Sequence, residues 1–456
     1  MRANYLTIII TTPFFVVCFI PAVSCNGEGS DRIPEQELFN LTRAQVIEMT
    51  LKPYNGISAK GVDKSTMTGK VLCGYQGWFA CPGDGSARGW FHWGRDVFKP
   101  GNCNIDLWPD MTEYSDDECY RTPFKYADGS PAYVFSSMHP KTVDRHFKWM
   151  ADYGIDGAFV QRFVTETVGE KQLLHANTVL ANCRAAANQH GRVYAVMYDL
   201  SGLQKDQTRL VIEDWKMLVD RMHLTKDAND QAYLHHNGKP VVAVWGIGFE
   251  GRSYTLEECA KLVDFLKNDK DCGGCTVMLG LPTYWQTLKN DSVTDPYLHD
   301  IVLKADIVSP WMVGRIRNMS DINEFVYNRI WVPDIKWCKK YNKEYLPVVF
   351  PGFSWNNLKK DPKVFNMIPR LGGNFLWKQY VEAKKVGATM IYQAMFDEVD
   401  EGTAIFKCTN NPPVGASKFL TYEGLPSDYY LWLVGQGGRM LRGEIPLTEE
   451  MPKRKE

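Results

Sequence analysis

The decisive stretch of this chain is GATMIYQAMF, residues 387–396, which runs directly into DEVDEGT, residues 397–403. Its apolar half predicts a buried β-strand. Its polar half places four carboxylates within five residues, which is electrostatically costly unless something binds there. A solvated acidic turn that ends at Gly402 is the alternative interpretation. The position after the last strand of a repeating series favours a site.

The rest of the chain repeats one unit, in which a short apolar run is followed by an amphipathic helical stretch. Strands are predicted at residues 70–75, 157–162, 192–198, 240–246, 276–281, 307–311, 345–350 and 389–396. Helices are predicted at residues 142–153, 171–189, 207–222, 255–268, 322–341 and 374–386. This alternation predicts an α/β protein, a (β/α)8 TIM barrel with long loops after its strands.

The barrel domain is expected to span residues 66–442. Its closing helix is predicted to begin near Pro426 with Ser427 as the N-cap, and to end at about Arg442. Residues 26–65 are predicted to form a tether and N-terminal extension, and residues 443–456 a polar tail.

The widest predicted loop, residues 76–141, is too long for a simple connection. It contains Trp78, Trp90, Trp93 and Trp108 together with Asp96, Asp106 and Asp110. We interpret it as a decorated active-site loop. A structural insertion pinned by disulfides is supported equally well by the local cysteines, and both interpretations can hold together.

Composition narrows the function classes. The 456 residues carry a formal charge of -1, so no basic excess points to a nucleic acid partner. The 14 Trp and 22 Tyr residues suit a site for a flat-faced ligand such as a sugar, although ordinary packing also uses them. The 9 His residues fall in predicted loops or helices, so no metal set is predicted, and no cofactor is expected.

Residues 1–25 resemble an export signal, with Arg2 followed by a nearly continuous apolar run over residues 5–20. The small residues Ala22 and Ser24 precede Cys25, as in a bacterial lipobox. We therefore predict lipidation of Cys25 and a place at the cell surface or in the periplasm, as an outer-membrane lipoprotein anchored only through its lipid. Plain cleavage and secretion is the alternative.

Ten cysteines remain after Cys18 and Cys25 are set aside, and an exported protein can oxidise them. We expect one or two disulfides in the N-terminal region among Cys73, Cys81, Cys103 and Cys119. The Cys272–Cys275 pair lacks a second pair at metal spacing, so a local staple or two free thiols is favoured over zinc.

The residues that follow each predicted strand are site candidates by position, because such barrels build their sites at the carboxyl ends of the strands. They combine acids, amides and aromatic rings, which suits a pocket that binds hydroxyls and stacks on sugar faces. The set is Tyr75, Gln76, Trp78, Gln161, Arg162, Tyr198, Asp199, Trp245, Glu250, Tyr284, Trp285, Trp311, Phe353 and Trp355.

Glu398 and Glu401 are the predicted catalytic residues, since glycosidic cleavage commonly uses one carboxyl group as acid and another as stabiliser or nucleophile. In a helical turn their spacing brings the side chains within about 5–6 Å, and repulsion should raise one pKa. Asp397 and Asp400 are expected to point away from the pocket and either to hydrogen-bond the backbone or to cap the following segment.

Two segments resemble a known family. Residues 396–403, FDEVDEGT, resemble the Asn-Glu-Trp-His-Glu-Gly-Thr signature of glycoside hydrolase family 99 endo-mannosidases. Residues 74–79, GYQGWF, resemble the first-strand segment of that family and of family 71-like proteins. The resemblance implies a retaining hydrolase without metal. It implies that Glu398 acts as base on the sugar 2-hydroxyl, giving an anhydro-sugar intermediate, and that Glu401 acts as acid and then base.

This chain departs from the signature at Asp397, Val399 and Asp400, so its sugar preference is expected to differ from that of the mannosidases. Divergent relatives are described as xylosidases or arabinosidases. The rival hypothesis is a non-catalytic carbohydrate-binding barrel lipoprotein, against which the two repelling glutamates argue. A metal-dependent hydrolase would need histidines at strand ends.

Overall fold

The computed structural model describes residues 40–61 and 63–454. The predicted signal segment and Cys25 lie outside the described residues. Within the described ranges, no helix combines the length and the apolarity that crossing a bilayer requires.

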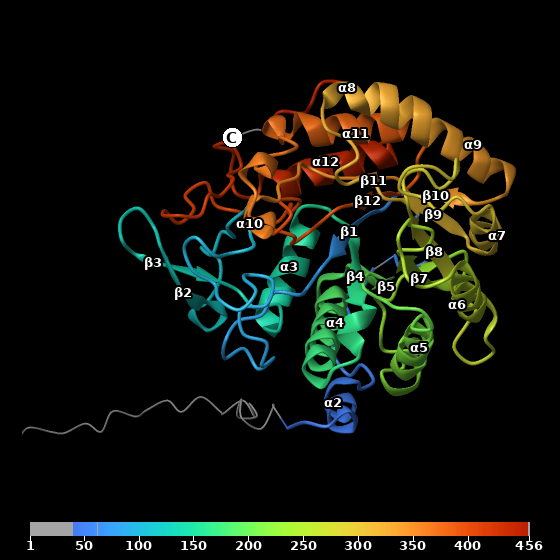
Figure 1. Ribbon diagram of the computed structural model, residues 1–456, viewed down its shortest axis with the longest axis horizontal. Helices are drawn as coiled ribbons and strands as arrows, with labels where there is room; N and C mark the ends of the chain where they lie inside the picture. Colours follow the sequence, from blue (N-terminus) through green and yellow to red (C-terminus); the bar gives the residue numbers. More distant parts are fainter. Residues whose placement is uncertain (1–39, 62, 455–456) are drawn as a thin grey trace, which may run out of the picture.

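The described residues contain a ring of parallel strands wrapped by helices (Figure 1). The hydrogen-bonded order is β10, β9, β8, β7, β5, β4, β1, β12 and β11. The bounds are β1 Val71–Tyr75, β4 Gly157–Phe163, β5 Val193–Asp199, β7 Lys239–Trp245, β8 Thr276–Leu281, β9 Ile307–Pro310, β10 Glu344–Tyr345, β11 Val348–Val349 and β12 Ile391–Gln393.

The two ends of this strand order are halves of one strand. Only Leu346 and Pro347 separate β10 from β11, and Pro347 has no N–H to donate to the ladder. The pairing nevertheless continues through both residues: the Leu346 N–H donates to the Val308 carbonyl at 2.9 Å, and the Tyr392 N–H donates to the Pro347 carbonyl at 3.0 Å. The ring therefore closes as eight parallel strand positions, each near its predicted range.

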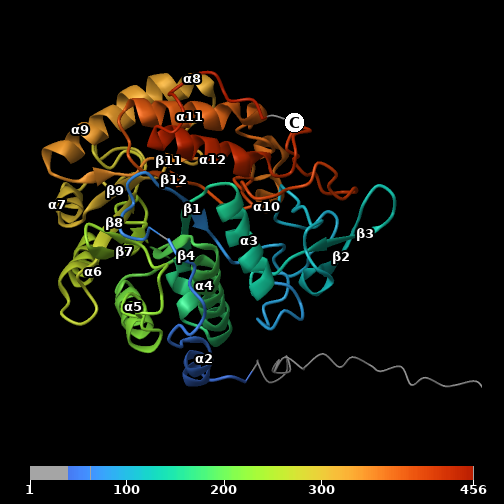
Figure 2. The same ribbon diagram turned by 180° about the vertical axis from the view of Figure 1, so that it is seen from behind.

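Helices pack around the ring of strands, as the view from behind also shows (Figure 2), and each of them lies near a predicted range except the one at residues 297–304, which was not predicted. They are α3 Pro140–Asp152, α4 Glu170–His190, α5 Arg209–Arg221, α6 Leu256–Asn268, α7 Tyr297–Lys304, α11 Asn374–Lys385 and α12 Tyr429–Arg442. A continuous helical stretch comprises α8 Met319–Asp321, the π-helical η3 Ile322–Trp331 and α9 Val332–Lys340.

The predicted N-cap of the closing helix is wrong by one residue. Asp428 occupies the position before α12, and Ser427 lies in the preceding turn, where the Tyr429 N–H donates to the Pro426 carbonyl at 2.9 Å. The Asp428 carboxylate is held by Arg454 at 2.5 and 2.8 Å, so the tail packs back onto the start of this helix.

Several short elements were not predicted, because they lack a long apolar period. They are α2 Arg43–Thr50, β2 Tyr120–Lys125, β3 Pro131–Val134, β6 His235–His236, α10 Asn356–Lys359, and the 3-10 turns η1 Asp116–Glu118, η2 Val164–Thr167, η4 Pro362–Val364 and η5 Leu371–Gly373. The hairpin β2–β3 lies in the long loop after β1, beside the segment that follows β12 (Figure 1). Isolated bridges join the two segments at Pro109–Cys408, Lys125–Val414 and Leu107–Leu420.

The long loop after β1 is held by aromatic packing. Trp93 and Trp108 are fully buried and pack with Phe98, at ring-centroid distances of 5.9 and 5.8 Å. The cysteines expected to bridge this region, Cys73, Cys81, Cys103 and Cys119, are all free thiols. The Cys81 thiol, for example, donates a hydrogen bond to the Phe135 carbonyl at 3.2 Å instead of forming a disulfide. The structural insertion therefore needs no disulfide, and Cys272 and Cys275 are free thiols as well.

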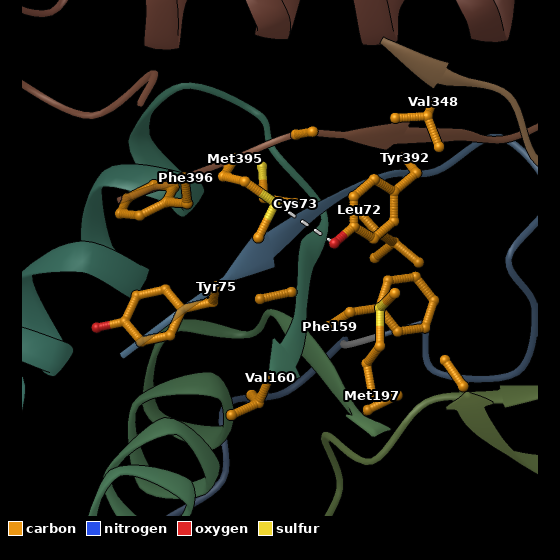
Figure 3. Packing of buried hydrophobic residues seen from close by; sticks show 14 of the residues in the cluster. Leu72, Cys73, Tyr75, Phe159, Val160, Met197, Val348, Tyr392, Met395 and Phe396 are labelled. Atoms are coloured by element: carbon orange, nitrogen blue, oxygen red, sulfur yellow. Dashed lines mark hydrogen bonds between the residues drawn. The ribbon is translucent and has the colours of Figure 1, made fainter. Parts of the chain in front are cut away.

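The strand pleat sorts side chains between the barrel interior and the helix layer (Figure 3). Tyr392, Phe159 and Met197 gather on one side of β1, whereas Tyr75 and Phe396 point away from them toward a neighbouring helix. The Tyr75 hydroxyl lies 2.9 Å from His146 Nδ1 of α3. This alternation, with a period of two residues, decides which strand-end residues reach the site.

Candidate active site

A cavity of about 750 Å³ opens at the carboxyl ends of the strands. Ten of its lining residues belong to the set predicted from strand ends and the acidic turn: Gln76, Trp78, Gln161, Asp199, Trp245, Trp311, Phe353, Trp355, Glu398 and Glu401. Residues not predicted are Phe163, Met197, Ser201, Phe249, Arg252, Val313, Gly314, Arg315, Arg317, Val364, Met367 and Met395.

The acidic turn after β12 is fixed to the end of β1. The Asp397 carboxylate accepts the backbone N–H of Gln76 at 2.8 Å and that of Gly77 at 2.9 Å. The prediction that Asp397 hydrogen-bonds the backbone is confirmed. Burial raises the pKa of Asp397 to about 7, against the effect of these two donors. This contact places Gln76 beside the next acid in the turn.

Glu398 is almost completely buried in the floor of the cavity. Its carboxyl group accepts the side-chain amide N–H of Gln76 at 2.6 Å and the hydroxyl of Thr403 at 2.5 Å. Burial raises the pKa of Glu398 well above its ordinary value, and the like charges of Glu401 and Asp400 add to the effect. The predicted repulsion within the pair is therefore present, although burial is the larger cause.

Glu401 lines the same cavity and is less deeply buried. Burial raises its pKa to about 8, and the like charge of Asp400 contributes. The Trp355 indole and the Lys359 ammonium act in the opposite direction. Its backbone carbonyl accepts the Ser354 N–H at 2.9 Å, which anchors the turn to the loop after β11. A carboxyl group with this pKa is largely protonated at neutral pH, as a general acid must be.

Asp400 forms a contact that the sequence analysis did not predict. Its Oδ2 lies 2.9 Å from Nδ1 of His92, a residue of the long loop after β1. The His92 ring stacks on Trp78, with centroids 3.7 Å apart and planes inclined by 6°. Burial lowers the pKa of His92 to about 3 and raises that of Asp400 to about 7. The sequence analysis did not predict this side-chain pair. By fixing His92, Asp400 also fixes the position of the Trp78 ring, which lines the cavity.

Asp199 and Gln161 stand on neighbouring strands of the cavity wall. Asp199 accepts the Ser201 N–H at 2.7 Å, and burial raises its pKa to about 6. The Gln161 amide donates to the Tyr392 hydroxyl at 2.8 Å, which leaves its carbonyl oxygen available in the wall. Gln161 precedes Arg162 and Asp199 follows Tyr198. Both of these neighbours face the helix layer, as the alternation of side chains along a strand requires.

Three predicted site residues face the helix layer instead of the main cavity. Tyr75 contacts His146, as described above. Arg162 donates to both carboxylate oxygens of Asp214 at 2.6 and 2.7 Å, and the Tyr198 hydroxyl donates to the same group at 2.7 Å. Each lies one residue away from an inward-facing neighbour on its strand. The two-residue alternation of side chains along a strand could have distinguished these three residues from the neighbours that line the cavity.

The other three exceptions lie in loops. Trp285 is fully buried and donates its indole N–H to Asp334 at 3.1 Å. Tyr284 lines a separate small cavity beside η3 and α9. Glu250 is exposed and does not line the cavity. Loop residues have no fixed period, so strand-based reasoning could not place them.

A second, smaller cavity of about 140 Å³ lies behind the wall that Trp78 and His92 form. It shares Gln76 and Gln161 with the main cavity and is also lined by Arg162. One terminal nitrogen of Arg162 is buried without a hydrogen-bond partner in the described part of the chain. Among those residues, no group of three or more His, Cys, Asp or Glu side chains has the arrangement of a metal site.

Comparison with solved structures finds chains that share this fold. A family 99 endo-α-mannosidase from Bacteroides thetaiotaomicron, in complex with bis-tris-propane, is 17% identical with a TM-score of 0.58, and the match covers 83% of this chain and 99% of that one. A second structure under the same description, without that compound, is 18% identical with a TM-score of 0.56 and the same coverage.

These likenesses show the fold, so the predicted (β/α)8 barrel is confirmed. The resemblance to family 99 noted in residues 396–403 is supported at the level of the fold. No label as xylosidase or arabinosidase gains support. A scan against protein-family models finds no match, and neither does a search of curated proteins.

Proposed function

We propose that this protein is a glycoside hydrolase that cleaves a polysaccharide or glycan, with Glu398 and Glu401 as its catalytic pair. The observation that carries the proposal is that both glutamates line one aromatic-walled cavity at the carboxyl end of the barrel. Buried acids with raised pKa values are typical of functional sites. A site that only binds sugar gains little from two acids that repel each other.

The two glutamates are suited to different roles. Glu398 accepts two hydrogen bonds, from Gln76 and Thr403, and these donors stabilise a carboxylate. Since the repelling pair cannot readily carry two negative charges, we assign the shared charge to Glu398 and the proton to Glu401. Glu401 then protonates the leaving oxygen, while Glu398 accepts the proton of the sugar 2-hydroxyl as that oxygen attacks the anomeric carbon. Water then attacks the anomeric carbon of the anhydro-sugar: Glu401 takes a proton from the water, Glu398 returns its proton to the 2-oxygen as the C1–O2 bond breaks, and the configuration is retained.

The aromatic residues are proposed to bind the sugar rings. Trp245 and Trp311 meet edge to face with centroids 5.7 Å apart, and the indole N–H group of Trp245 is buried without a partner in the described chain. Such a wall offers faces for stacking and N–H donors for hydroxyl groups. The resemblance supplies mannose, xylose and arabinose as the candidate sugars.

The test is release of reducing sugar from mannans, xylans, arabinans and host-type glycans by the mature protein. Glu398→Gln and Glu401→Gln are expected to abolish release, whereas Glu250→Gln, a matched change at an exposed glutamate outside the cavity, should leave it unchanged. Binding of a glycan by all forms without cleavage by any would instead support a non-catalytic carbohydrate-binding barrel.

We also propose that the chain is exported and anchored through a lipid on Cys25, since residues 1–25 have the form of a lipoprotein signal. Labelling with a radioactive fatty acid in a bacterial host should mark the wild-type chain and leave Cys25→Ala unlabelled. Label on the variant, or none on the wild type, would contradict the anchor.

A further inference from the structure

The cavity has a basic side that the proposed chemistry does not use. Arg252 lies in the loop after β7, and Arg315 and Arg317 lie in the loop after β9; all three line the cavity. In the closed ring, β7 is four strand positions from β12, so its loop stands across the barrel from Glu398 and Glu401. Arg252 therefore faces the catalytic pair from the far side of the cavity, whereas Arg315 and Arg317 approach from β9, only two strand positions from β12.

Arg252 retains an uncompensated charge. Its guanidinium carbon lies 5.5 Å from the Trp245 ring centroid and 5.6 Å from that of Phe249, so aromatic faces orient it. It donates a long hydrogen bond to the Ser201 hydroxyl at 3.4 Å. Among residues 40–61 and 63–454, no carboxylate forms an ion pair with it. Its N–H donors are therefore available to a ligand.

The loop after β9 presents a second free cation. Arg315 is paired with Asp291 at 3.0 Å, which holds the loop against the segment after β8. Arg317 is exposed, and only its backbone N–H is used, as a donor to Asp321 at 2.8 Å. No ion pair within the described ranges involves the Arg317 side chain. Two of the three guanidinium groups on this side are thus unpaired.

The acids of the cavity do not cancel this charge. Burial raises the pKa values of Glu398 and Glu401, so the pair carries less than its two formal charges at neutral pH. Asp199 is the remaining cavity acid, and the Arg252 charge lowers its pKa while burial raises it to about 6. Asp199 is still largely ionised at neutral pH, but one aspartate faces two unpaired arginines, so this side keeps a positive field.

We propose that the substrate is an acidic glycan, and that Arg252 and Arg317 bind a carboxylate or sulfate group on a sugar next to the one that is cleaved. The inference rests on the proposed glycosidase function. A guanidinium group is well matched to either anion, because its planar N–H fork donates two parallel hydrogen bonds. The cavity, at about 750 Å³, is in the upper part of the range of about 300–1,000 Å³ typical of ligand pockets.

The experiment compares acidic glycans with neutralised copies of the same chains. The probes are glucuronoxylan, polygalacturonate and chondroitin sulfate, each beside its carboxyl-reduced form, with desulfated chondroitin as a further arm. Wild type should cleave at least one acidic probe at least about tenfold faster than its neutralised form, a difference of about 1.4 kcal/mol. If carboxyl reduction slows cleavage, the recognised group is the carboxylate of a uronate. If desulfation slows cleavage, the recognised group is a sulfate ester.

Arginine variants locate the effect. Arg252→Gln and Arg317→Gln should raise KM for the acidic probe about tenfold or more and leave cleavage of its neutralised form unchanged. Arg221→Gln, at an exposed arginine in the last turn of α5, should behave as wild type on both. Added salt should weaken the preference, because screening acts on the charged contact alone. Circular dichroism confirms that each variant is folded.

The two claims fail in different ways. Equal cleavage of acidic and neutralised chains, or arginine variants that match wild type on both, overturns the acidic substrate and leaves the glycosidase standing. Full activity in Glu398→Gln or Glu401→Gln overturns the proposed catalytic pair while the charge preference is still measured. No cleavage and no binding of any probe contradicts both proposals.

Discussion

Replacing Glu401 by glutamine should make the protein more stable while removing its activity. Burial and the neighbouring Asp400 raise the pKa of Glu401 to about 8 in the folded chain, from an ordinary value of 4.5. Between these values the folded chain holds a proton that the unfolded chain has released. Stability contributed by this group is therefore lost as pH rises through that window, and glutamine, which does not titrate, avoids the loss.

The size of the effect follows from the same window. For each pH unit above 4.5, the free energy of unfolding of the wild type falls by about 1.4 kcal/mol. The loss at neutral pH therefore has an upper limit of about 3 kcal/mol. Glu401 is partly exposed, and solvent screening reduces this to about 2 kcal/mol.

The assay is urea unfolding followed by tryptophan fluorescence, at about pH 4.5 and at neutral pH. Glu401→Gln should match wild type at the lower pH and exceed it by about 2 kcal/mol at the higher one. The exposed control Glu250→Gln should show no difference that depends on pH. A variant that is less stable at neutral pH, or one that gains equally at both values, would refute the reasoning.

Three further changes test the packing around the site. Asp397→Ala leaves two buried N–H groups unpaired and should cost about 2–4 kcal/mol in urea unfolding, with Asp397→Asn costing less; equal losses would contradict the two-donor contact. Arg162→Ala strands the buried Asp214 carboxylate and should cost about 3–5 kcal/mol by the same assay, so an unchanged unfolding free energy would count against the ion pair. Asp400→Asn removes a like charge that raises the pKa of Glu401. The alkaline limb of the pH profile of kcat/KM should therefore move to lower pH. An alkaline limb that stays in place would show that Asp400 does not act on Glu401.

The strand framework could be predicted because parallel barrel strands are buried on both faces and read as apolar runs. The run at residues 345–350 was placed correctly even though Pro347 divides it into β10 and β11. The acidic turn was recognisable because Glu398 and Glu401 follow such a run directly. The order of the strands then brings residues 74–79 and 397–403 together, since β1 pairs with β12.

The remainder depends on contacts between distant loops. The pairing of His92 with Asp400 joins residues 308 positions apart, and no local pattern encodes it. Arg252 and Arg317 enter the cavity from loops whose path is set by packing, so neither was predicted. Tyr75, Arg162 and Tyr198 were expected at the site because position along the chain was used without the two-residue alternation of the strand.

Comparing the single and double glutamate variants on the glycan that wild type cleaves is the most direct test of the catalytic pair. We predict that Glu398→Gln and Glu401→Gln each lower kcat/KM by about 10²–10⁴-fold. We also predict that kcat/KM of the double variant is close to that of the less active single variant, because the effects of residues that act as a unit do not add. A single variant with kcat/KM close to wild type, in a correctly folded protein, would contradict the account.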